Sequence, residues 1–276
     1  MEITLLDEDT RLLGLLETVW GTIIALCREF NDDDWSKQTE CPEWSVKDTL
    51  SHLVGIEYRL TSRNVKCINI EHTEHIKNDL GLRNEIDVIL RRSSSGETIL
   101  SEFWNITRER LQTLTQLCKV GFSTDVDTPI GPKPFSELLS MRIMDCWLHE
   151  QDIRRAVNKP GNVDGDVAEH TVSRLFSAMP YVIAKKVGAT NGTTVVFRIR
   201  GQVEFTKCIY VDGKRARNMA SIPEYSDTSL SMTSKAFILL ASGRVGHQNP
   251  FIYDDVRIEG NIDLGRQILK MMNIMI

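Results

Sequence analysis

One stretch is the most informative about the fold of the first half of this chain: Met141-Arg-Ile-Met-Asp-Cys-Trp-Leu-His-Glu-Gln-Asp-Ile-Arg-Arg155. On an α-helix, where each residue turns by about 100°, one face collects residues three, four and seven apart. That face holds Leu138, Met141, Arg142, Asp145, His149, Asp152 and Ala156. The other faces are apolar through the middle of the stretch, which predicts a helix that is buried nearly all round. Ionisable groups on a buried helix are costly unless they pair or bind a metal.

Three more amphipathic helices precede this one. Apolar residues recur every three or four positions from about Asp7 to Phe30, and Ser45-Val-Lys-Asp48 is typical of a helix start. A third helix is expected over about Glu97–Cys118, after the breaker at 93–96, and the fourth covers Phe135–Asn158. Four such helices, with one long connection at about 63–97, predict a four-helix bundle over residues 1–158.

The pattern changes after the turn-rich segment Lys159-Pro-Gly-Asn-Val-Asp-Gly165. A helix is expected over 167–185 and short helices over 235–242 and 264–272. Alternating or β-branched runs predict strands at 194–199, 203–211, 229–232 and 255–259. Residues 166–276 are therefore expected to form a small α+β domain.

Composition narrows the class of protein. The 276 residues carry 33 basic and 38 acidic side chains, a net charge of −5, which argues against a nucleic-acid partner. No uninterrupted apolar run reaches the roughly 18 residues of a membrane helix, and the acidic first ten residues do not resemble a signal peptide. The six cysteines are scattered and none forms a C-x-x-C pair, so we expect reduced thiols. These features predict a cytoplasmic protein with no membrane partner.

Asp145 and His149 are four residues apart on one helix face, a spacing that suits two ligands of one cation. His52, at the edge of the apolar face of the second helix, would complete a three-ligand set with an open position, as in catalytic zinc sites. The same residues also fit an intrahelical ion pair and a buried core histidine, and an Asp/His pair at this spacing is common by chance. The spacing alone leaves both interpretations open.

Two segments resemble a known family. Cys41-Pro-Glu-Trp-Ser-Val-Lys-Asp-Thr-Leu-Ser-His-Leu-Val-Gly55 and Asp145-Cys-Trp-Leu-His-Glu-Gln-Asp-Ile-Arg-Arg-Ala156 are similar to the two signature segments of the mycothiol-dependent maleylpyruvate isomerase family, which belongs to the DinB-like metalloenzymes. Asn78–Val88 and Gly131–Pro134 resemble the segments between them. Ser242–Arg244 and Val256–Gly265 more weakly resemble the family's C-terminal domain, which is like sterol carrier proteins.

The resemblance implies a metal centre and a cofactor. The family positions that match His52, Asp145 and His149 hold a divalent metal, usually zinc, although the best-known member has Glu where this chain has Asp145. The reactive thiol belongs to mycothiol or a related small thiol, which binds the metal as thiolate and adds to an electrophilic carbon. The implied activity is that of an isomerase or S-transferase on a small maleylpyruvate-like substrate.

Further side chains are candidates for roles around such a centre. Arg83 and Arg244 are predicted to clamp a substrate carboxylate, because guanidinium binds carboxylate in a bidentate manner. Glu57 and Asp152 are each expected either to orient a ligand histidine or to pair with Arg142.

Other candidates rank lower. The segment around Cys41 is typical of a turn that leads into the second helix. Cys41 is not expected to be the nucleophile, because in the family the cofactor supplies the reactive thiol. His72 and His75 are expected to lie on a solvated surface.

Two other functions stay open at this point: a metal-dependent hydrolase on the same scaffold, and a non-catalytic protein that binds a small molecule. The expected partners are a small-molecule substrate and the thiol, and the protein is expected to be a monomer or a homodimer.

Overall fold

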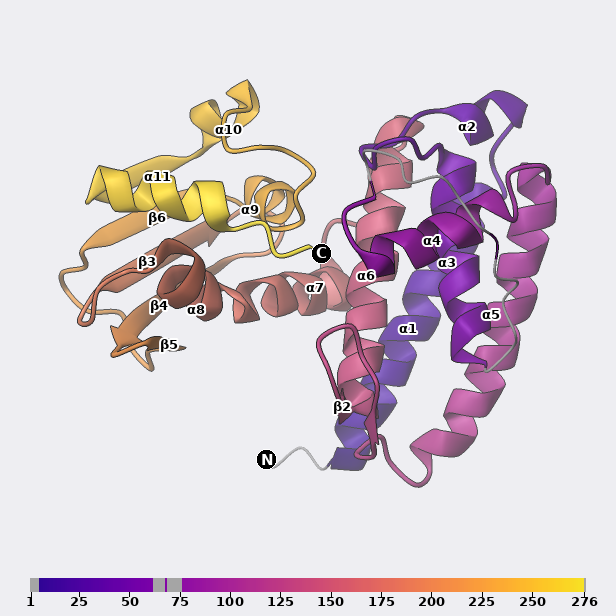
Figure 1. Cartoon of the computed structure of the whole chain (residues 1–276), viewed down its shortest axis with the longest axis horizontal. Coiled ribbons are helices and arrows are strands. Elements are labelled where there is room, and N and C mark those ends of the chain that lie inside the picture. The colour runs from indigo at the N-terminus through magenta and orange to yellow at the C-terminus, as the bar shows by residue number, and fades with distance from the viewer. Residues whose placement is uncertain (1–4, 62–67, 69–75, 276) are drawn as a thin grey trace. The chain divides into compact units, whose positions relative to one another are not determined.

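The computed structural model describes residues 5–61, 68 and 76–275. The chain divides into two compact units, Met1–Asn162 and Val163–Met275, and each is described by itself. Figure 1 shows both units along the chain. His72 and His75 of the sequence analysis, and Cys67, one of the six cysteines, lie outside the described residues.

Four long helices form the first unit and run side by side (Figure 1): α1 (Leu5–Cys27), α3 (Val46–Leu60), α5 (Gly96–Cys118) and α6 (Phe135–Ala156). Helix α1 packs against α5 and α6, and α3 packs against the same two helices. The predicted four-helix bundle is therefore confirmed. Side chains from different helices, including Leu16, Leu53, Phe103 and Ile143, are fully buried between them.

Helix α1 contains one window, within Asp7–Cys27, that is long and apolar enough to cross a membrane by length and composition. The sequence analysis considered only uninterrupted apolar runs, and this window contains a few polar residues, so it was not noticed there. Half of that window is buried inside the protein, and Leu16, Val19 and Ile23 are fully buried. Core helices of globular bundles pass the same test, and α1 packs as one of them.

The connection expected at about 63–97 is not entirely irregular, because it contains helix α4 (Asp79–Ile89). The Asn78 side chain caps it by accepting a hydrogen bond from the backbone N–H of Gly81. Helix α4 packs on α3 where Gly55, which lacks a side chain, lets Asp87 approach closely. The helix escaped sequence analysis because part of its buried face is charged, with Glu85 and Asp87 both buried.

Smaller elements complete the first unit. Helix α2 (Asp32–Ser36) starts with a capping box in which the side chains of Asn31 and Asp34 bond each other's backbone N–H. Strands β1 (Asp125–Val126) and β2 (Lys133–Pro134) pair in a short antiparallel ladder just before α6.

The second unit is a five-stranded sheet with helices, in the order β5-β4-β3-β6-β7 (Figure 1). Its strands are β3 (Thr194–Arg200), β4 (Phe205–Asp212), β5 (Arg215–Asn218), β6 (Thr228–Thr233) and β7 (Arg257–Gly260). Strands β3 and β6 are parallel and the other pairs antiparallel. Phe176, Phe197 and Phe237 meet edge to face or tilted in its core. The predicted α+β class is confirmed.

The helices of this unit are α7 (Gly165–Ser177), α8 (Met179–Tyr181), the π-helix η1 (Val182–Val187), α9 (Ser234–Ala241), α10 (Pro250–Asp255) and α11 (Ile262–Met271). The single helix expected over 167–185 is thus three successive helical segments. Strand β5 was missed because Arg-Ala-Arg-Asn carries no apolar alternation, so only its pairing with β4 at the sheet edge makes it a strand.

Candidate metal centre

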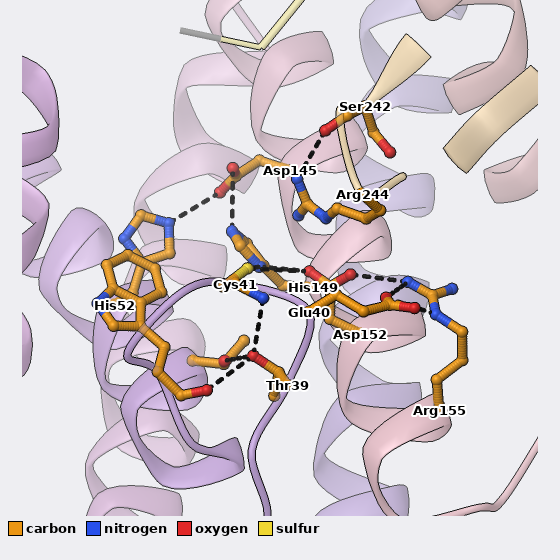
Figure 2. Close-up of polar contacts among 12 residues, drawn as sticks. Thr39, Glu40, Cys41, His52, Asp145, His149, Asp152, Arg155, Ser242 and Arg244 are labelled. Carbon is orange, nitrogen blue, oxygen red and sulfur yellow. Dashed lines mark hydrogen bonds and ion pairs between the residues drawn. The ribbon is translucent and has the colours of Figure 1, made fainter. Parts of the chain in front are cut away.

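Helices α3 and α6 bring His52, Asp145 and His149 together. The His52 and His149 side chains are buried, and that of Asp145 is 20% exposed. Nε2 of His52 lies 3.6 Å from Oδ2 of Asp145, and Nε2 of His149 lies 3.6 Å from Oδ1. Figure 2 shows the three side chains pointing toward one another. The two ring centroids are 4.8 Å apart, with the rings edge to face.

These distances fit a bound cation better than direct hydrogen bonds. A hydrogen bond between nitrogen and oxygen is shorter than about 3.2 Å. At 3.6 Å the histidine nitrogen and the carboxylate oxygen are therefore slightly too far apart to be hydrogen-bonded. Around tetrahedral zinc, with ligand bonds of about 2.0–2.2 Å, neighbouring nitrogen and oxygen ligands are ~3.4 Å apart. His52, Asp145 and His149 therefore have both the chemistry and the spacing of a zinc ligand set with room for a further ligand.

The opposite ring nitrogen of His149 is held by a buried carboxylate. Nδ1 of His149 lies 3.0 Å from Oδ2 of Asp152, which is fully buried. Arg155 donates to the other oxygen, Oδ1, at 2.7 Å, and also bonds Glu40. A carboxylate on the far nitrogen fixes the tautomer and the ring orientation of a ligating histidine. Of the two roles weighed for Asp152, this geometry agrees with orienting His149.

Asp145 is held by a second buried network. Arg142 donates from Nη1 to Oδ2 of Asp145 and from Nε to Oε1 of Glu57 at 2.9 Å. The other oxygen of Glu57 accepts from Nε of Arg110 at 3.1 Å. Glu57 is fully buried between the two arginines, so it pairs with Arg142 instead of touching a histidine. The chain Arg110–Glu57–Arg142 fixes Asp145 and leaves Oδ1 directed at His149.

Burial and the charges of the centre together shift three pKa values. Burial lowers the pKa of His52 to about 4, so its ring is neutral at neutral pH, the form that can bind a metal. Burial also opposes charge on His149, but Asp145 and the hydrogen bond to Asp152 outweigh it and raise the pKa of His149 to about 10. Burial disfavours the ionised form of Asp145 as well, yet Arg142 and His149 hold the pKa of that carboxyl well below its usual range.

Zinc binding is expected to tighten as pH rises through neutrality, because the ion must displace the proton that His149 holds below a pKa of about 10. Displacing one proton lowers the apparent dissociation constant about tenfold per pH unit. Competition with a chromophoric chelator at several pH values measures this slope. Asp152→Asn removes one cause of the raised pKa of His149. The zinc affinity of this variant should therefore stop rising at a lower pH than that of the wild type. An affinity that does not change with pH contradicts the expectation.

Sequence reasoning missed one residue at the centre, Trp44. Its ring centroid lies 5.0 Å from that of His52 and 6.3 Å from that of His149. The indole N–H donates to the buried Glu85 of α4 at 2.8 Å, and the Trp44 carbonyl accepts from both the backbone N–H and the hydroxyl of Thr39. Trp44 is thus a fixed apolar wall beside both histidines. An aromatic residue directly before the Ser45 cap was the available signal.

The two arginines predicted to bind substrate lie on elements other than α3 and α6. Arg83 is exposed on α4, and in the described part of the chain no hydrogen bond or ion pair links it to His52, Asp145 or His149. Arg244 belongs to the second unit, in the turn after α9, where Nη1 donates to the Ser242 carbonyl at 2.9 Å. Figure 2 draws that contact. Both roles stay predictions.

Comparison with known proteins gives two family matches. Residues 16–154 match the model of the mycothiol maleylpyruvate isomerase N-terminal domain, and residues 175–273 match the SCP-2 sterol transfer family. A search of curated protein sequences finds no match.

Among solved structures, the chain is similar to a mycothiol-dependent maleylpyruvate isomerase and to its histidine-to-alanine variant, each with a TM-score of 0.54. Identity is 16%, over 91% of this chain and 92% of each of those chains. At this identity the likeness shows the shared fold.

Proposed function

This chain belongs to the mycothiol maleylpyruvate isomerase family, and on that premise we propose that it is a metal-dependent isomerase or S-transferase that uses mycothiol or a related small thiol. The proposed substrate is a small electrophile of the maleylpyruvate type. One observation carries the proposal: the matched domain contains two buried histidines and a carboxylate at zinc-ligand spacing, with His149 oriented by Asp152.

His52, Asp145 and His149 would hold the ion. A divalent ion with an open coordination position lowers the pKa of a thiol that reaches it, so that the thiol is nucleophilic at neutral pH. A maleylpyruvate-type cis double bond then becomes a target for thiol addition, rotation and elimination.

The surrounding residues of the chain prepare the centre. Asp152 keeps the proton of His149 on Nδ1 and so directs Nε2 toward Asp145. Arg142 keeps Asp145 ionised and oriented. Trp44 places an apolar ring beside both histidines, where it excludes water and strengthens the electrostatic interactions of the centre.

The thiol is expected to be an obligatory reactant. Zinc-loaded protein with a maleylpyruvate-like substrate should turn over with mycothiol and should be inactive without an added thiol. A chelated sample should be inactive with the thiol present, and should recover when zinc is returned. Product analysis by NMR separates a trans isomer from a thioether adduct.

Two other results would overturn the proposal. Turnover without any thiol would mean that water reacts at the centre, as in a hydrolase. Binding of a small molecule without turnover under any of these conditions would identify a non-catalytic binding protein.

A further inference from the structure

Cys41 lies on the far side of His149 from Asp145, in contact with the carboxylate that orients His149. Its Sγ is 3.8 Å from Nδ1 of His149 and 3.4 Å from Oδ2 of Asp152. Figure 2 shows these three side chains converging, with Arg155 and Glu40 beyond Asp152. The thiol is half-buried, whereas His149 and Asp152 are buried. The ligand atoms all lie within 4.8 Å of one another.

The three donors match the preferences of a soft or borderline metal ion. Thiolate, imidazole nitrogen and carboxylate oxygen all occur as zinc ligands, and thiolate selects for softer ions. With zinc–sulfur bonds of about 2.3 Å and zinc–nitrogen bonds of about 2.0 Å, tetrahedral ligand atoms are ~3.4–3.6 Å apart. The sulfur distances of 3.4 and 3.8 Å bracket this range, and the 3.0 Å between Nδ1 and Oδ2 needs only a small opening.

We propose that Cys41, His149 and Asp152 form a second metal site, for a soft divalent cation, which shares the His149 ring with the first centre through the opposite nitrogen. Arg155 holds Asp152 by Oδ1, so Oδ2 stays directed at Cys41 and His149. Binding forms bonds from the ion to Sγ, Nδ1 and Oδ2. The thiol proton and the proton on Nδ1 are released to the buffer, so the reaction needs no oxidant or reductant.

Occupation of this site has a consequence for the first centre. The ion replaces the hydrogen bond between Nδ1 of His149 and Asp152, and the ring then bridges two cations. The electron density that His149 gives to the ion on Nε2 therefore changes. We infer that an excess of a soft ion perturbs the first centre through this ring.

Cadmium chloride tests the site directly, because a sulfur-to-cadmium charge-transfer band in the ultraviolet requires a thiolate ligand. The first centre contains no sulfur ligand, so the band does not come from cadmium at that centre. Protein loaded with one equivalent of cobalt is titrated with cadmium. Wild type should develop the band with a stoichiometry of about one, and the cobalt visible spectrum should shift in parallel.

Matched variants identify the residues that give rise to the sulfur-to-cadmium band. Cys41→Ser should lose it and should keep its cobalt spectrum unchanged by cadmium, whereas Cys118→Ser, another half-buried cysteine, should behave as wild type. Asp152→Asn keeps the thiol and should bind cadmium at least about tenfold more weakly. Circular dichroism checks that each variant is folded, and Asp152→Asn still tests the site if Cys41→Ser does not fold.

The proposal is overturned if wild type shows no sulfur-to-cadmium band, or if Cys41→Ser keeps the band at full amplitude. If the wild type shows the sulfur-to-cadmium band without any shift of the cobalt spectrum, the two sites do not share the His149 ring. All readouts are taken without substrate, so failure of this site and failure of the proposed reaction are separate results.

Discussion

Replacing His149 by alanine is expected to remove the bound metal and to lower thiol-dependent turnover more than a hundredfold. His149 is one of the three proposed ligands, and the ring is buried with Asp145 on one side and Asp152 on the other. Loss of a residue that merely orients a ligand already costs about 10–100-fold in metal affinity or activity, so loss of a ligand should cost more. Elemental analysis and the mycothiol assay measure the two effects.

His52→Ala should behave in the same way, because its ring faces the same carboxylate from a different helix. His170→Ala, a half-buried histidine of the second unit, is the matched control and should keep one equivalent of metal. Equal metal content in wild type, His52→Ala and His149→Ala would refute the assignment of these ligands.

Glu57→Ala is expected to lower the free energy of unfolding by about 3–5 kcal/mol, the cost of leaving a buried charge without its partner. Glu57 is fully buried and neutralises Arg110 and Arg142 at once, so its removal takes this carboxylate from Arg110 and leaves Arg142 with Asp145. Urea unfolding measures the loss, which is a large part of the 5–15 kcal/mol that typically stabilises a domain.

Glu17→Ala is the matched control for this prediction. Glu17 is exposed on α1, where a substitution should change stability by no more than about 0.5 kcal/mol. If both variants unfold at the same urea concentration, the buried network contributes little to the free energy of unfolding. Metal content of Glu57→Ala then shows separately whether Arg142 still directs Asp145.

The second cation site and the first one would be affected differently by these changes. Glu57→Ala acts on Asp145 through Arg142, and leaves the contacts of Cys41 with Asp152 untouched. A cadmium titration of this variant should therefore still give the sulfur-to-cadmium band, even where the cobalt content falls.

Local residue spacing was enough to predict the bundle helices and the pairing of Asp145 with His149. Both depend on residues three to seven positions apart, and such spacing maps directly onto one face of a helix. The start of α3 was predicted closely for the same reason, since Ser45 caps it through atoms three residues away, and the breaker at 93–96 gave the start of α5 to within one residue of Gly96. His52 was predicted as a third ligand from its place on the second helix, and the family resemblance favoured the same residue.

The side chains that surround the centre are brought there by contacts between residues far apart in the chain. Cys41 meets Asp152 across 111 positions of the chain, Glu57 meets Arg142 across 85, and Trp44 meets Glu85 across 41. No periodicity encodes such contacts, because they depend on how separate helices and one loop pack. Helix α4 and strand β5 were missed for a related reason: part of the buried face of α4 is charged and β5 has no apolar alternation, so packing against α3 and β4 supplies what their own sequences lack.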